Sequence, residues 1–366
     1  MSFARTRIKG IVFCDSRAAF HGLTLYTPAE GKGVLLVDLL GNLVHRWELS
    51  HEAAATASLL PNGNLLYGAI FADAPLSDLE GTGGIVQELN PAGEMVWEYR
   101  DPALHHAPFR MKNGNTLVMK WVEIPKKVTA RVKGGEAGTE RDGSLWGDAI
   151  QEIRPDGTVV WEWIAHERMK PEEFHRCPLC PRDTWMHGNS CIELPNGNIL
   201  VSFAKINTVA IIDRESGDIL WHWGTGGELA HQHAPSMLEN GNVLIYDNGF
   251  HPQGLALNFS RVVEVNWRKS EMVWSYEGPE GGTLKMLFFS SMYSNCQRLP
   301  NGNTLICEGM TGRIFEVTAY QNLVWEYVNA FPGPEVVASP AESRSYPVYG
   351  AYRYGHDYPG LLGLKL

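Results

Sequence analysis

The chain lacks any apolar run long enough to cross a membrane, because no stretch approaches about 18 consecutive apolar residues. The run Ile11-Val12-Phe13, which follows the basic N-terminal residues, is too short for the hydrophobic region of a signal peptide. Excess positive charge is missing too, since the formal net charge is −10. This charge excludes the basic surface expected of a protein that binds nucleic acid or an anionic membrane. We therefore expect a cytoplasmic protein with neither partner.

Cysteine is scarce, with six residues in 366. So few thiols fit a reduced cytoplasmic protein better than a disulfide framework. His175, Cys177 and Cys180 form the run His-x-Cys-Pro-Leu-Cys, which has the spacing of half a zinc site. Because the sequence has no second Cys-x-x-Cys, a loop with incidental thiols is favoured over a structural metal at this position.

One short sequence motif recurs throughout the chain. Asn-Gly is the strongest short-range signal for a β-hairpin, because both residues accept the positive φ of a type I′ turn. Asn-Gly-Asn occurs between apolar runs at residues 62–64, 113–115, 196–198, 240–242 and 301–303. A second marker is a tryptophan in a Trp-x-aromatic or related pattern, found at Trp47, Trp97, Trp161, Trp221, Trp274 and Trp325.

The tryptophan markers stand 50, 64, 60, 53 and 51 residues apart. Self-similarity at this period predicts radial repetition of small antiparallel sheets. The fold class is therefore all-β, a six-bladed β-propeller of four-stranded antiparallel sheets with long loops over one face. We expect residues 1–366 to form a single domain, with a tail at 330–366 packing on or over the propeller. The predicted blades span residues 8–49, 51–99, 104–163, 185–223, 231–276 and 289–327.

Four histidines stand at matched positions before the Asn-Gly-Asn turns. His106 and His233 lie seven residues before the first Asn of their turns, and His187 and His231 lie nine before it. Offsets of seven and nine differ by two, so these side chains should point to the same side of their strands. Their blades are consecutive, and the four imidazoles are expected to share one cavity at the axis. A single inward histidine is more often structural, but four at matched offsets favour a functional site.

Other residues are candidates for the same site. Tyr293 stands where an inward residue is expected in the last blade, since the chain has no histidine between His251 and His356. His356 would join the cavity if the tail folds over its mouth. Arg261 is either half of a salt bridge with Glu264 or an anion-binding group.

Several motifs around these residues resemble the arylsulfotransferase family of β-propellers. They are Trp185-Met186-His187-Gly188-Asn189-Ser190, Gln232-His233, Tyr246-Asp247-Asn248-Gly249 and Ser260-Arg261-Val262-Val263-Glu264. The resemblance covers most of the chain from the second blade to the sixth. It implies a six-bladed propeller with an axial active site for small aromatic substrates, and His187 and His233 as active-site histidines. It also implies transfer of a sulfuryl group through a transiently sulfated histidine.

Three functions follow as hypotheses. The favoured one is lyase or hydrolase chemistry on a small aromatic compound, with a divalent transition metal and no nucleotide cofactor. The alternatives are a metal-free aryl sulfotransferase with His187 or His233 as nucleophile, and a non-catalytic protein-binding propeller. No oligomeric state is indicated. The predicted metal ligands are His106, His187, His233 and His231. The predicted catalytic residues are His187, His233, Tyr293 and Arg261, and the predicted substrate-binding residues are Asn189, His251 and His356.

Overall fold

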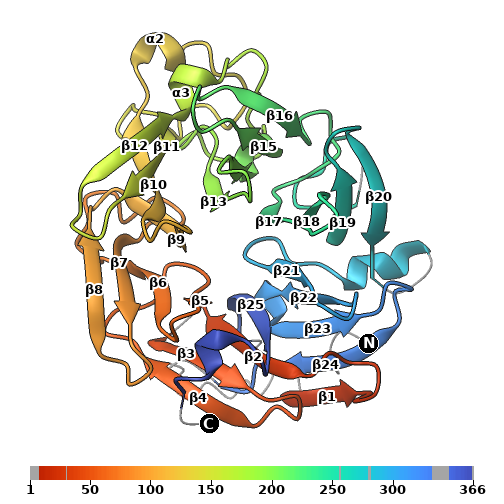
Figure 1. Cartoon of the computed structure of the whole chain (residues 1–366). Coiled ribbons are helices and arrows are strands. Elements are labelled where there is room, and N and C mark those ends of the chain that lie inside the picture. The colour runs from red at the N-terminus through yellow and green to blue at the C-terminus, as the bar shows by residue number, and fades with distance from the viewer. Residues whose placement is uncertain (1–7, 30, 255–256, 279–281, 332–345, 365–366) are drawn as a thin grey trace, which may run out of the picture.

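Six β-sheets surround a central axis in the computed structural model (Figure 1). The structure describes residues 8–29, 31–254, 257–278, 282–331 and 346–364. Each sheet has at least four antiparallel strands, so the predicted all-β, six-bladed propeller is confirmed. No helix in the described part of the chain is long and apolar enough to cross a membrane.

Each blade is one sheet, and its strands follow one another from the axis outward. The first is β25 (Val348–Gly355), β2 (Gly22–Pro28), β3 (Gly33–Val37) and β4 (Leu43–Glu48), and the second is β5 (Ser58–Leu59), β6 (Leu65–Ile70), β7 (Gly84–Leu89) and β8 (Met95–Arg100). The third is β9 (Leu104–Arg110), β10 (Thr116–Glu123), β11 (Trp146–Ile153) and β12 (Val159–Ile164), and the fourth is β13 (Gly188–Glu193), β14 (Ile199–Phe203), β15 (Thr208–Ile212) and β16 (Ile219–Trp223). The fifth is β17 (His233–Met237), β18 (Val243–Asp247), β19 (Arg261–Asn266) and β20 (Glu271–Tyr276), and the sixth is β21 (Asn295–Arg298), β22 (Thr304–Glu308), β23 (Arg313–Val317), β24 (Leu323–Val328) and β1 (Gly10–Cys14).

The helices are short and lie in the connections. They are α2 (Lys126–Thr129), α3 (Ala165–Arg168) and the 3₁₀ helices η1 (Ala204–Ile206), η2 (Gly282–Leu287), η3 (Gly309–Thr311) and η4 (Pro359–Leu361). The middle strands of each sheet are buried on both faces, because apolar side chains of one blade pack against those of the next. The core is therefore spread as layers between blades, and it leaves the inner strands free to line the axis.

The first blade differs from the predicted span of 8–49. β1 pairs with β24 at the outer edge of the sixth sheet, and β25 pairs with β2 as the innermost strand of the first. The blade's own stretch of sequence supplies three strands, so the inner edge of β2 takes its partner from the predicted tail. Residues 332–345 of that tail lie outside the described residues. Those from 348 to 355 belong to a blade and do not cover the mouth.

The turn type also differs from the prediction. Gly63 has φ 87°, but Asn62 is not among the residues with positive φ, and the same holds at the other four turns. The Gly63 N–H donates to Leu60 O at 2.9 Å, which closes a type I turn followed by a left-handed glycine. The Asn62 side chain accepts from the Asn64 N–H at 3.0 Å and stabilises this form. Pro61 provides the φ that the first central position of a type I turn requires.

A recurring polar contact joins one blade to the next. Glu264 accepts from the side-chain amides of Asn240 at 3.0 Å and Asn242 at 2.7 Å, and pairs with Arg298 of the next blade at 2.9 Å. The Arg298 guanidinium lies 4.9 Å from the centre of the Trp274 ring. The same glutamate–arginine pairing recurs as Glu88 with Arg110, Glu152 with Arg214, and Glu316 with Arg353.

Candidate functional site

A cavity of about 490 Å³ lies at the axis. Residues from all six blades form its wall, from Tyr349 of the first and Thr56 of the second to Tyr293 of the sixth. Seven of the predicted site residues line it: His106, His187, Asn189, His231, His233, His251 and Tyr293. The expectation that imidazoles of consecutive blades share one cavity therefore agrees with this structure, whereas their chemical roles stay predictions.

Left-handed backbone turns the axial residues inward. His106, His187, His231 and Tyr293 have φ between 55° and 59°. Residues other than glycine rarely adopt this backbone conformation, and the exceptions are concentrated at functional sites. Strand pairing is irregular at the inner strands of the third, fourth and fifth blades. Simple alternation along a strand, from which the shared cavity was predicted, is therefore not what brings these histidines together.

His233 is held in one orientation by its Nδ1 atom. That atom lies 2.7 Å from Asn248 Oδ1 and 3.1 Å from the carbonyl oxygen of His231. Both partners accept, so Nδ1 carries the proton and Nε2 has a free lone pair. Asn248 is fixed in turn, because its amide donates to Ser290 O at 2.8 Å. Burial lowers the pKa of His233, so this imidazole is neutral near neutral pH.

Three further imidazoles form a group beside His233, in which His105 and His187 are buried and His106 is half-buried. The rings of His106 and His187 meet edge to face, with centres 5.0 Å apart. His105 was not predicted, because its offset of eight places it between the matched positions; its Nδ1 lies 2.9 Å from His106 Nδ1. Burial lowers the pKa of His106 to about 3, with a further contribution from His233. Burial also holds the pKa of His187 and that of His105 well below the usual value.

Asp148 lies behind this group. Its Oδ1 accepts from the Gly188 N–H at 2.7 Å and lies 3.5 Å from His105 Nε2. Burial raises the pKa of Asp148 to about 7. A Cβ atom at position 188 would lie 2.8 Å from Asp148 Oδ1, so the glycine that follows His187 is required by this close approach.

Two polar atoms in the cavity wall have no protein partner. His187 Nδ1 and Asn189 Oδ1 are buried and make no hydrogen bond to any described residue. A buried polar atom without a partner is costly, and functional sites are a common reason for one.

Lys205 is the one lysine or arginine among the described residues that line the cavity. Its Nζ lies 3.1 Å from Glu80 Oε2 and 3.5 Å from Asp183 Oδ1. Burial opposes ionisation of Glu80, but the Lys205 ammonium outweighs it and lowers the pKa of that carboxyl. The sequence pattern did not predict this pair because both residues lie in connections beyond the strands that follow the Asn-Gly-Asn turns, where no motif repeats. An isolated lysine after the mainly apolar run 199–204 was the available signal.

Two predicted site residues lie outside the cavity wall. Arg261 pairs with Asp247 at 2.8 Å and donates to Glu228 O, whereas Glu264 pairs with Arg298. The predicted Arg261–Glu264 salt bridge is therefore not formed, and the anion-binding role of Arg261 stays a prediction. His356 is exposed and does not line the cavity, because the end of the chain enters the first sheet.

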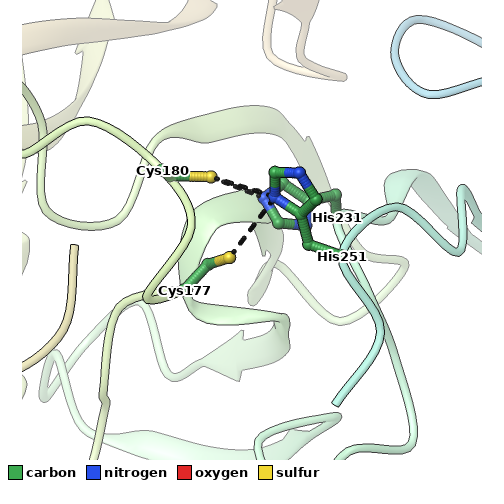
Figure 2. Close-up of side chains that lie close together, drawn as sticks. All are labelled: Cys177, Cys180, His231 and His251. Carbon is green, nitrogen blue, oxygen red and sulfur yellow. Dashed lines mark hydrogen bonds between the residues drawn. The ribbon is translucent and has the colours of Figure 1, made fainter. Parts of the chain in front are cut away.

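A separate group combines two thiols and two imidazoles. Figure 2 shows the side chains of Cys177, Cys180, His231 and His251 pointing toward one another. One donor atom of each lies within 4.8 Å of the others, and the described chain contains no second group of three or more histidine, cysteine or acidic donors with this geometry. Of the four predicted metal ligands, His231 is the one that belongs to this group, and His175 does not belong to it. Two histidines from the fifth blade thus approach the Cys-x-x-Cys turn and complete a group that could hold a metal ion, an arrangement that the sequence did not predict.

Comparisons with known proteins agree with this architecture. The sequence model of a family described as "Arylsulfotransferase (ASST)" matches residues 56–330. No curated protein matches the chain.

Solved structures resemble the chain at low sequence identity. A protein of unknown function from Bacteroides caccae is 13% identical, with 91% of this chain and 98% of that chain covered and a TM-score of 0.54. A catalytically inactive virginiamycin B lyase from Staphylococcus aureus in complex with quinupristin is 11% identical, with 88% of each chain covered and a TM-score of 0.46. At 13% identity, the likeness to the Bacteroides protein is one of fold alone.

Proposed function

The chain belongs to the arylsulfotransferase family, and we propose that it transfers the sulfuryl group of a small aryl sulfate in the axial cavity, with His233 as the nucleophile. The observation that carries this proposal is the hydrogen bonding of His233 Nδ1, which leaves Nε2 as the nitrogen with a free lone pair. A histidine nucleophile must be neutral, and burial lowers the pKa of His233 accordingly.

The proposed reaction has two steps. His233 Nε2 attacks the sulfur, an N–S bond forms, and the S–O bond to the donor phenol breaks, so that the phenolate leaves and takes up a proton from solvent. A phenol acceptor then attacks the same sulfur and loses its proton to solvent, and the N–S bond breaks to return neutral His233. His106 and His187 lie in the same wall, but their lowered pKa makes them weak bases, so no proton transfer is assigned to them.

The charges of the cavity disfavour a doubly charged ester. Lys205 supplies one positive charge, and Glu80 and Asp183, which also line the cavity, share it. An aryl sulfate has one negative charge, whereas an aryl phosphate has close to two at neutral pH. We therefore propose that the cavity accepts aryl sulfates and rejects aryl phosphates.

The aromatic part of the substrate has suitable surroundings. Phe250, Tyr293, Tyr349 and Tyr352 line the cavity, and the rings of Tyr293 and Tyr349 meet edge to face with centres 4.8 Å apart. Aromatic side chains provide a large contact area for a flat ring. These residues support a phenolic donor and acceptor.

The test is turnover of 4-nitrophenyl sulfate with and without a phenol acceptor. Release of 4-nitrophenol that depends on the acceptor is expected, and 4-nitrophenyl phosphate should not react. His233→Ala should lower the rate roughly a thousand-fold, whereas His356→Ala, at an exposed histidine, should leave it unchanged. Full activity of His233→Ala would exclude the proposed nucleophile.

A metal-dependent lyase or hydrolase acting on a small aromatic compound is the second candidate. The observation that favours it is that Cys180, His231 and His251 belong both to the thiol–imidazole group and to the cavity wall. Such an enzyme would convert its substrate without a sulfate donor and would lose activity when a chelator removes the metal. Acceptor-dependent transfer that persists in the chelated protein would decide against it.

A further inference from the structure

Three segments far apart in the sequence meet at the thiol–imidazole group. Cys177 and Cys180 lie in the connection between α3 and β13, His231 lies just before β17, and His251 follows β18. We infer that these four side chains form a closed, structural zinc site that fastens the Cys177–Cys180 turn to the fifth blade.

The distances between donor atoms match tetrahedral zinc. With Zn–S bonds of about 2.3 Å and Zn–N bonds of about 2.0–2.1 Å, a tetrahedral angle separates sulfur from nitrogen by about 3.6 Å. His251 Nδ1 lies 3.6 Å from Cys177 Sγ and 3.7 Å from Cys180 Sγ, which matches this separation, whereas His231 Nε2 lies closer to Cys180 Sγ, at 3.1 Å. All four donor atoms lie within 4.8 Å of one another, so small side-chain movements would admit an ion.

The type and number of donors select the metal and its role. Two thiolates and two imidazoles in tetrahedral geometry are typical of zinc. Catalytic zinc sites keep a coordination position open for water or substrate, and four protein donors leave none. The site is therefore structural, and it is distinct from the sulfuryl transfer proposed at His233.

His231 presents a defined ring nitrogen. His231 Nδ1 donates to the carbonyl oxygen of Phe250 at 2.7 Å, so Nε2 is the unprotonated atom that faces Cys180. A histidine that binds a metal usually donates its other ring N–H to a carbonyl or carboxylate in this way. The backbone is held as well, because the His231 N–H donates to Asn207 Oδ1 at 3.0 Å and the Cys177 N–H donates to Lys205 O at 2.7 Å.

Burial and charge support the same conclusion. Cys177, Cys180 and His231 are buried and His251 is half-buried. Thiolates at this depth need a positive partner. The guanidinium of Arg176 is also buried, but it is engaged with the carbonyl oxygens of Thr184, Pro181 and Trp185.

The zinc site would stabilise the wall of the axial cavity. Cys180, His231 and His251 line the axial cavity, and the same connection carries Lys205's partner Asp183. A zinc ion joining the turn to the fifth blade would hold this part of the wall in place. Because the predicted readout is metal content, failure of the sulfuryl transfer proposal leaves this inference untouched, and the reverse holds too.

The test is elemental analysis of the full chain purified without nickel-affinity steps from zinc-supplemented medium. We expect about one zinc per chain, falling below about a tenth in Cys177→Ser and in His251→Ala, of which the second alters a half-buried residue and should fold normally. Cys14→Ser and His175→Ala lie outside the group and should keep the full zinc content.

Cobalt provides an independent readout. Replacing zinc by Co²⁺ should produce an intense visible spectrum with sulfur-to-cobalt charge-transfer bands, which Cys177→Ser should weaken by about half and His251→Ala should shift. Folded protein with less than about a tenth of an equivalent of zinc would overturn the inference. A Cys177–Cys180 disulfide in that protein would overturn it as well, and so would a zinc content that survives both substitutions.

Discussion

The position of the His233 ring depends on Asn248. The Asn248 side chain accepts from His233 Nδ1 and donates to Ser290 O, and its backbone carbonyl accepts from the Ser260 hydroxyl at 2.9 Å. Asn248 therefore couples the tautomer of His233 to the sixth blade. The Asp-Asn-Gly and Ser-Arg motifs of the sequence have this positioning role, because Asp247 pairs with Arg261 and its carboxylate accepts the Gly249 N–H at 3.3 Å.

Replacing Asn248 tests this positioning. Asn248→Ala should lower kcat for aryl sulfate turnover by roughly 10- to 100-fold, because Nδ1 loses its main acceptor and the ring can change tautomer. Asn248→Asp restores an acceptor but adds a negative charge, which favours the imidazolium and raises the pKa of His233. The acidic limb of its kcat/KM profile should therefore move to higher pH. Identical pH profiles for the wild type and Asn248→Asp would contradict this role.

Asp148 makes stability depend on pH. Burial raises its pKa from 3.8 to about 7, against the opposing influence of Lys205 and Arg176. The folded-state pKa lies above the unfolded one, so the native chain retains a proton that the unfolded chain has released. The resulting stabilisation is complete below about pH 4 and is lost as the pH rises through about 7.

Asp148→Asn removes this dependence while keeping an acceptor for the Gly188 N–H. Relative to the wild type, the free energy of unfolding of Asp148→Asn should rise by on the order of 2 kcal/mol between roughly pH 5 and pH 8. Urea denaturation across this range measures the difference, with Asp73→Asn at an exposed position as the control. A difference that stays constant with pH would show that Asp148 does not titrate in this window.

At the scale of the element, the third strand of each blade decides how that blade contacts the next. Four of the blades carry the glutamate that joins the Asn-Gly-Asn turn to an arginine. In the fourth blade Ile211 takes the corresponding position, paired with Leu200 as Glu264 is with Leu244. In the following blade, Met237 packs against the apolar cluster that contains Ile211. Polar and apolar versions of the contact thus remain matched across each junction.

Glu264→Ala should lower the free energy of unfolding by about 2 kcal/mol. The substitution removes the acceptor of Asn240 and Asn242 and leaves the Arg298 guanidinium, whose side chain is 20% exposed, without its carboxylate. Thermal and urea unfolding measure the change. Glu271→Ala, at an exposed position of β20, should have almost no effect, and an equal loss in both variants would argue against a specific contact.

The repeats were predictable because their signals are local. Turn residues and strand alternation recur with each blade, so six blades followed from the sequence alone. The Cys177–His251 contact was not predictable, because it joins two irregular connections whose approach depends on the whole ring. The inward direction of His106 depends on its left-handed backbone conformation, and no adjacent glycine or proline in the sequence predicts that conformation. Offsets therefore identified histidines that share the cavity, whereas strand alternation does not explain why they converge.

At the scale of the molecule, strands from both ends of the chain close the ring. Figure 1 shows β1 beside β24 and β25 beside β2, which places the two contributions at the junction of the sixth and first blades. Arg353 of β25 pairs with Glu316 of the sixth blade, and its guanidinium lies 4.1 Å from the centre of the Trp325 ring. The closing junction thus uses the same glutamate–arginine–tryptophan contact as the internal ones.

Removing β25 should therefore open the propeller. A chain that ends at Phe331 leaves the inner edge of β2 unpaired and removes Tyr349 and Tyr352 from the cavity wall. We expect loss of cooperative unfolding and of near-ultraviolet circular dichroism. Arg353→Ala keeps the strand and removes the buried ion pair, the hydrogen bond to Thr24 and the contact with the Trp325 ring, so it should unfold cooperatively but with about 3 kcal/mol less stability. If the shortened chain unfolded at the wild-type Tm, β25 would not be needed to close the ring.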